Sequence, residues 1–126
     1  MSYTNATNLS AEHTEWLGKL DFYEKELGIL KERLTEIAGK NSSFEARAGI
    51  EHFQNQFIVQ QNNIDELKHA VKENMHLAFE EVKEHAGHIG SGTVSEYKII
   101  DDAVRSFEKV VNELRHEFNL YLAKWM

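Results

Sequence analysis

Apolar side chains recur at alternating intervals of three and four residues along most of the chain, and this spacing limits the possible folds more than any other feature. It places the apolar side chains on one stripe of an α-helix, which has 3.6 residues per turn. The chain also contains no proline, so no position forces a kink or a break. We therefore expect an all-α protein whose long helices pack along their length.

Three stretches carry the pattern, and they are separated by Gly39-Lys40-Asn41 and by the glycine-rich segment 87–92. Ser10 is a suitable N-cap for the first helix, and Ser42 with Glu45 has the spacing of a capping box for the second. The expected helices cover residues about 10–38, 43–86 and 93–125. We predict that all 126 residues form one domain, an antiparallel helical bundle of three long helices with a long central helix.

The central stretch decides between three helices and four. Its apolar positions keep one phase from Ala46 to Val71, which favours a single helix of about 44 residues and about 66 Å. This phase continues across the polar segment Gln60-Gln61-Asn62-Asn63. The alternative uses Asn63 as a new N-cap with Glu66 three residues later, and it gives an up-down four-helix bundle with a break near Asn63.

The apolar stripe of the central stretch is expected to change its phase near the end. After Val71 the apolar residues move by one position to Met75, Ala78 and Val82. A shift of this kind is typical of a stutter, which locally changes the winding of a coiled coil.

Apolar residues outside the stripes indicate self-association. A central helix longer than its neighbours cannot be covered fully within one chain, and leaving a cluster of large apolar side chains in water is costly. A homodimer covers them most simply, because two-fold pairing lets one patch serve both partners. The alternative is that they widen the stripe within one bundle. The predicted interface residues are Phe22, Ile29, Ile58, Phe79, Leu120 and Leu122.

Composition argues against several other partners. The formal net charge is −7 and the sequence pI is about 5.5, so phosphate backbones are repelled and nucleic acid is not expected to bind. No apolar run approaches the roughly 20 residues of a membrane span. Cysteine is absent, and the first residues have no basic segment followed by an apolar one, so we expect a cytoplasmic protein.

Histidine is the one residue type that suggests a metal. The chain has seven histidines, and Glu-x-x-His pairs give it the composition of ferritin-like or hemerythrin-like bundles. Antiparallel packing would place His13, His69, Glu113 and His116 at one height, with Asp65 nearby, and zinc or iron takes such ligands. Most of these residues face outward by their helical positions, so we expect surface residues and no cofactor.

Two stretches resemble a known group of proteins. They are His13-Thr14-Glu15-Trp16-Leu17 leading into residues 22–27, and residues 51–58 leading into residues 62–67. These segments are similar to those of short, uncharacterised bacterial all-helical proteins. The resemblance implies a bacterial intracellular origin, and it implies no activity.

The function predicted from these observations is that of a structural or protein-interaction bundle without catalytic activity. No serine, histidine and acid share a plausible pocket, so we predict no catalytic residues. The first alternative is a metal-binding bundle that uses the histidines and acids named above. The second is a small-molecule sensor with its ligand between helices near Trp16 and Tyr97.

Overall fold

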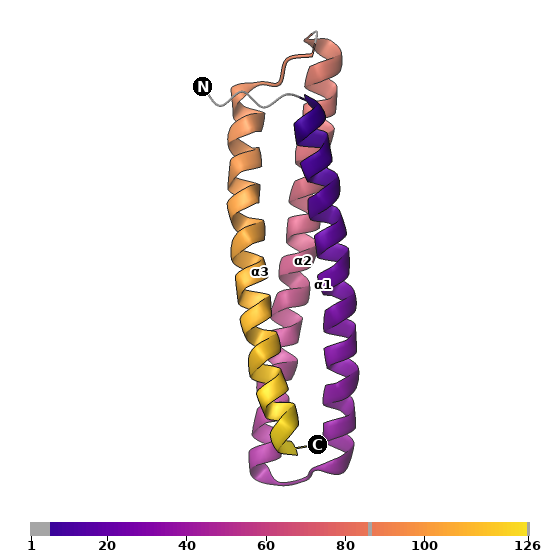
Figure 1. Cartoon of the computed structure of the whole chain (residues 1–126), viewed down its shortest axis with the longest axis vertical. Helices are drawn as coiled ribbons and strands as arrows, with labels where there is room; N and C mark the ends of the chain where they lie inside the picture. Colours follow the sequence, from indigo (N-terminus) through magenta and orange to yellow (C-terminus); the bar gives the residue numbers. More distant parts are fainter. Residues whose placement is uncertain (1–5, 86, 126) are drawn as a thin grey trace.

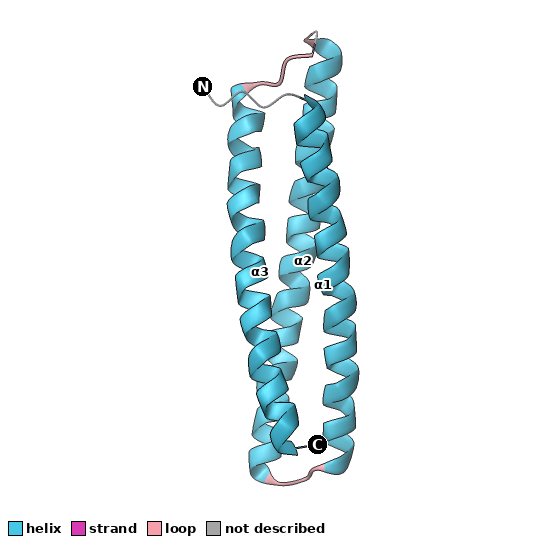
Figure 2. Cartoon of the chain, viewed as in Figure 1, coloured by secondary structure: helices cyan, strands magenta, loops and turns pink. Residues whose placement is uncertain are grey.

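The computed structural model describes residues 6–85 and 87–125. Within these ranges the chain forms three helices and no strands: α1 (Ala6–Lys40), α2 (Phe44–Glu84) and α3 (Ser91–Trp125). The helices lie side by side along one long axis, with α2 behind α1 and α3 (Figure 1), and short loops connect them (Figure 2). The prediction of an all-α antiparallel bundle with a long central helix is confirmed.

The central helix is continuous. It runs for 41 residues and passes through Asn63 without a break, so the four-helix alternative is wrong. The Asn63 side chain caps no helix, and it donates a hydrogen bond from Nδ2 to Gln60 Oε1 at 3.2 Å. The apolar phase that continues across the polar segment is thus a property of one long helix.

The predicted stutter after Val71 is wrong. The buried stripe of α2 continues from Val71 to Asn74 and Ala78, which keeps the spacing of three and four residues. Met75 and Val82 lie only half-buried at the edge of this stripe. Asn74 is polar but occupies a core position. A pattern that considers only apolar residues therefore assigns the core position to its apolar neighbour Met75.

The helix ends differ from the predictions by about one turn or less. Helix α1 begins at Ala6, four residues before the expected cap at Ser10. The N-cap of α2 is Ser43, whose Oγ accepts a hydrogen bond from the backbone N–H of Ala46, and Ser42 lies outside the cap. At the same end of the bundle, Asn41 Nδ2 donates to the carbonyl oxygens of Ile37 and Trp125. This side chain therefore ties the α1–α2 loop to the last turn of α3.

The core is one continuous column of apolar side chains between the three helices. Phe53 and Phe57 of α2 pack against Phe118 of α3 with ring centroids 5.1 and 5.2 Å apart, in edge-to-face orientations. Such pairs contribute roughly 0.5–1.5 kcal/mol beyond the burial of their area. No helix of the described residues is both long enough and apolar enough to cross a membrane.

A close approach between α2 and α3 depends on Gly49. The ring of Tyr121 lies where a Cβ atom at position 49 would be, and the Tyr121 hydroxyl donates a hydrogen bond to the carbonyl oxygen of Ala46 at 2.7 Å. Burial raises the pKa of this hydroxyl. A side chain at position 49 would have to displace the ring and break this hydrogen bond.

The Gly49→Ala substitution should lower the free energy of unfolding by about 1 to 3 kcal/mol, because overpacking outweighs the gain of about 1 kcal/mol in helix propensity. Gly18→Ala is the matched control. A Cβ atom added at position 18 would extend into open space, so alanine there should raise stability by about 0.5–1 kcal/mol. Urea denaturation followed by circular dichroism measures both values, and an equal stabilisation by the two substitutions would contradict the close packing at position 49.

The connection between α2 and α3 is held by Glu81. Its carboxylate accepts hydrogen bonds from Thr93 Oγ1 at 2.7 Å and from the backbone N–H of Gly90 at 2.9 Å. These two hydrogen bonds lower the pKa of Glu81, because they stabilise its charged form. Gly87 in this connection has a φ of 89°, a conformation that favours glycine.

The stabilising effect of Glu81 should depend on pH. A lowered folded-state pKa means that this stability is present above the pKa of the unfolded chain and is lost as the pH falls through the folded-state pKa. Replacing Glu81 by glutamine should therefore cost about 0.5 kcal/mol at neutral pH and less as the pH falls below about 4. Denaturation curves between about pH 3 and pH 7 test this. Glu84→Gln, at an exposed position without these hydrogen bonds, is the control, and a pH-independent effect of the Glu81 substitution would contradict the prediction.

Candidate functional site

A buried polar layer lies near the N-terminal end of α1. His13 and Asn74 are each 1% exposed, and His13 Nε2 lies 2.8 Å from Asn74 Oδ1. Asn74 Nδ2 donates to the carbonyl oxygen of Thr93 at 3.1 Å, which turns its Oδ1 toward the histidine. The hydrogen of this imidazole is therefore assigned to Nε2, since an amide oxygen can only accept. The layer links one residue from each of the three helices.

Aromatic rings cover this layer on the side of α1 and α3. The Trp16 and Tyr97 rings contact each other with centroids 5.0 Å apart. The His13 ring meets both of them edge-on, at 5.8 Å from Trp16 and 6.2 Å from Tyr97. The sequence suggested a small molecule near Trp16 and Tyr97. These two rings contact each other directly, and a hollow of about 340 Å³ beside Trp16 is lined mainly by charged side chains such as Lys19 and Glu108.

The polar layer favours one register of the helices. Sliding α2 by one heptad would leave His13 and Asn74 buried without partners, and each unpaired buried polar group costs about 1–3 kcal/mol. A polar residue at a core position commonly specifies register in coiled coils at some cost in stability. We therefore infer that the hydrogen bonds of His13, Asn74 and Thr93 help to fix the axial register of the three helices.

The predicted metal ligands are not brought together. His69 is exposed on α2 and pairs with Glu73 at 3.5 Å, and Asp65 accepts a hydrogen bond from Gln61. Glu113 and His116 are exposed on α3, whereas His13 is in the core. In the part of the chain that the structure describes, no three His, Asp or Glu side chains lie close enough to hold a metal ion.

The predicted heights of these residues along the bundle are wrong. His13 lies level with Asn74 of α2 and with Thr93 and Tyr97 of α3, instead of His69 and the stretch from Val111 to His116. The error is about 7.5 Å on α2, where five residues separate His69 from Asn74, and about 21 Å or more on α3, where 14 residues separate Tyr97 from Val111. It arises because the loops offset the helices by an amount that helix lengths alone do not give.

Five of the six predicted interface residues are exposed apolar side chains. Their exposed fractions run from 48% for Ile29 to 64% for Phe79. Leu122 is different, because it is half-buried and packs against the core. Sequence reasoning missed further exposed apolar residues: Phe44, Val59, Leu77, Ile99 and Val110. Their positions outside the stripes of α2 and α3 were the available signal.

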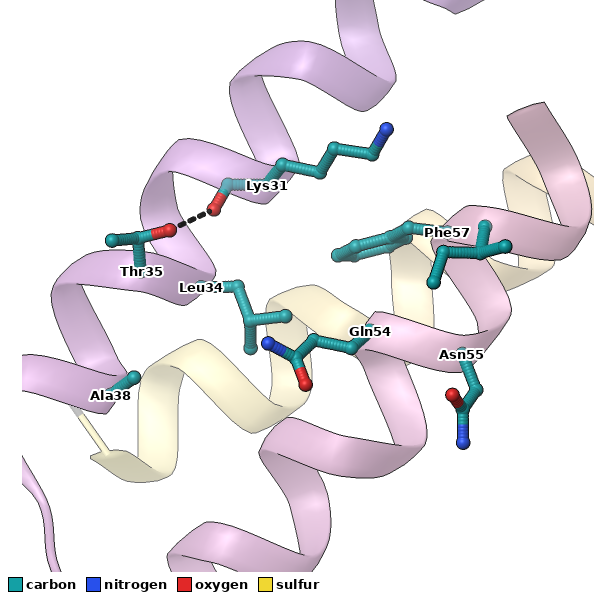
Figure 3. Close-up of a pocket in the computed structure, with 8 residues that line it drawn as sticks. Lys31, Leu34, Thr35, Ala38, Gln54, Asn55 and Phe57 are labelled. Carbon is teal, nitrogen blue, oxygen red and sulfur yellow. Dashed lines mark hydrogen bonds between the residues drawn. The ribbon is translucent and has the colours of Figure 1, made fainter.

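Shallow hollows follow the groove between α1 and α2. One of about 450 Å³ is lined by four residues of each helix: Lys31, Leu34, Thr35 and Ala38 of α1, and Gln54, Asn55, Phe57 and Ile58 of α2. Figure 3 shows Leu34, Phe57 and Gln54 between the two helices, whereas the Asn55 side chain points away from α1. Gln54 and Asn55 are both exposed. The Thr35 hydroxyl donates to the carbonyl oxygen of Lys31 within α1, so it offers no free donor to a ligand (Figure 3).

Polar and charged side chains bridge the two helices across the middle of the α1–α2 groove. Lys68 of α2 lies 2.6 Å from Asp21 and 3.1 Å from Glu24 of α1, and Gln61 donates to Glu24 at 2.8 Å. The hydrogen bond that Lys68 donates to Asp21 raises the pKa of Lys68 and lowers the pKa of Asp21. The hydrogen bonds from Gln61 and then Lys68 lower the pKa of Glu24. The α1–α2 groove is therefore divided by a polar bridge.

The side between α1 and α3 is also bridged by charges. Lys19 pairs with Glu108 at 3.2 Å, and Glu26 pairs with Arg115 at 3.6 Å. The Tyr23 hydroxyl donates to Glu108 as well. The hydrogen bond that Lys19 donates to Glu108 is the main cause that raises the pKa of Lys19. These contacts join α1 and α3 at several levels.

The third groove, between α2 and α3, is bridged at one end, where Lys124 lies 3.8 Å from Glu45, and no ion pair joins the described side chains that line its middle. A hollow of about 470 Å³ lies there, with the small side chains Ala70, Ala103 and Ser106 along it. Val110 at its edge is 45% exposed. The exposed surface of this hollow is mainly apolar.

Comparison with protein-family models, curated proteins and solved structures gives no match to this chain.

The His13–Asn74 hydrogen bond should be measurable in a double-mutant cycle. Asn74→Ala leaves the His13 ring and the Thr93 carbonyl without this partner, so we expect a loss of about 2 to 3 kcal/mol in the free energy of unfolding. In the His13→Leu/Asn74→Leu double variant the polar groups are removed together. It should be more stable than the sum of the two single leucine variants by about 1 kcal/mol or more. Additive effects would show that the two side chains do not depend on each other.

Proposed function

We propose that this protein is a non-catalytic helical interaction module that associates with a second copy of itself. The observation that carries the proposal is the exposure of large apolar side chains outside a core that is already complete. Each such side chain contributes about 1.5–3 kcal/mol when it is buried. An exposed apolar cluster on a folded monomer is therefore a candidate contact surface.

The pair Phe22 and Ile29 on α1 is the candidate self-association patch. The two residues are one heptad apart, so they lie on the same face of the helix, and about half of each side chain is exposed. In a two-fold antiparallel pairing of α1 with its copy, Phe22 of one protomer would face Ile29 of the other. One patch then serves both partners, as two-fold symmetry requires.

Glutamate at both positions 22 and 29 should abolish the dimer. Sedimentation equilibrium of the unmodified protein is expected to give twice the chain mass of 14.6 kDa, and Phe22→Glu/Ile29→Glu should give the chain mass itself. The Phe44→Glu variant changes an exposed apolar residue at the start of α2, outside the predicted interface, and should remain dimeric. A mass of one chain for the unmodified protein at all concentrations would overturn self-association.

A further inference from the structure

The groove between α2 and α3 has a different character from the proposed α1 patch. Side chains of both helices line its hollow, and three of them are alanine or serine: Ala70, Ala103 and Ser106. Small side chains let another backbone approach closely. Leu67 and the buried ring of Phe107 form the apolar part of its floor, and the buried Gln60, which accepts a hydrogen bond from Asn63, also lines it.

Further exposed apolar side chains lie on the helix faces that line this hollow. Positions seven residues apart share a face of a helix. Val59 lies one heptad before the groove residue Glu66, and Ile99 lies one heptad before Ser106, so both belong to the same faces. Val59 and Ile99 are exposed, as are Val110 and Leu120 on α3. These exposed apolar residues flank the hollow, and they share their heptad series with Glu66 on α2 and with Ser106 on α3.

The edges of the groove are acidic. On α2 the heptad series of Val59 continues with Glu66 and Glu73, and on α3 the series of Ile99 reaches Glu113, all exposed. A second copy placed on this face would bring these carboxylates near their own counterparts, which is unfavourable. Lys124 lies at the far end of α3, where it is 3.8 Å from Glu45.

We propose that the α2–α3 groove binds an amphipathic helix with basic flanks. Its apolar face would lie over Ala70 and Ala103, and its lysine or arginine side chains would reach Glu66 and Glu113. Binding of an amphipathic helix in an apolar groove is a common recognition mode, and a fourth helix here completes a four-helix arrangement. The proposal extends the proposed function, because it gives the interaction module a second, chemically different partner.

The probe is a synthetic helical peptide with leucine at alternating spacings of three and four residues and lysine on both flanks, labelled with fluorescein. A peptide with the same leucines and glutamate in place of lysine is its control. Fluorescence anisotropy should show the basic peptide bound at least about tenfold more tightly than the acidic one, a difference of about 1.4 kcal/mol. Its affinity should fall as salt screens the flanking charges.

Two matched pairs of variants locate the binding site. Glu66→Lys/Glu113→Lys should weaken binding of the basic peptide about tenfold or more. Its control is Glu32→Lys/Glu36→Lys, which makes the same change of net charge at exposed positions of α1. The control should weaken binding much less. Val110→Ser should weaken binding, and Ile58→Ser, outside the groove, should not. Equal effects within either pair, or equal affinity for the basic and acidic peptides, would overturn the proposal.

Sedimentation of the same samples separates this inference from self-association. A dimer that fails to distinguish the two peptides refutes the groove and leaves the α1 patch. A monomer that binds the basic peptide in a Glu66- and Glu113-dependent way supports the groove and refutes the α1 patch.

Discussion

The fold depends on one buried stripe that runs the length of α2. Both other helices pack against this stripe, with His13 of α1 on Asn74 and with Phe118 of α3 on Phe57. Because the spacing of three and four residues is kept through Gln60 and Asn74, the stripe stays turned toward the same neighbours over the whole helix. The two polar residues within it cost stability where an apolar residue would contribute burial. One of them, Asn74, favours one axial register of the three helices, because its hydrogen bonds to His13 and to the Thr93 carbonyl can form only in that register.

Much of this fold could be predicted from the sequence, because apolar periodicity reports directly which side chains are buried. Apolar periodicity gave the wrong core residue at Asn74. Met75 was predicted to be buried because it is apolar, although a spacing of three and four residues between Val71 and Ala78 places position 74 in the core. The pattern could not place His13 against its partners, because the offset between helices is fixed by loop geometry and side-chain packing. Apolar periodicity also could not predict the α2–α3 groove. Recognising that groove requires knowing which flank of each helix faces its neighbour, and sequence spacing gives only the buried stripe.

The outer surface has two regions that we propose as contact regions for different partners. The α1–α2 groove and the α1–α3 side are bridged by ion pairs, such as those of Lys68 and Lys19, so their charged groups are already used within the chain. The apolar pair Phe22 and Ile29 lies outside these bridges and suits a copy of itself. The middle of the α2–α3 groove has apolar side chains and acidic edges, and we propose a basic helix as its partner.

The continuity of α2 is the claim on which all of these positions depend, and a distance measured across it tests the claim most directly. The chain has no cysteine, so Arg47→Cys/Lys83→Cys gives two unique sites for nitroxide labels near the ends of α2. Double electron–electron resonance should give a single distance distribution centred near about 54 Å, the length of an unbroken helix between these residues at 1.5 Å per residue. A distribution centred below about 25 Å would mean that the chain turns back near Asn63 into two helices packed side by side, and it would contradict a continuous α2.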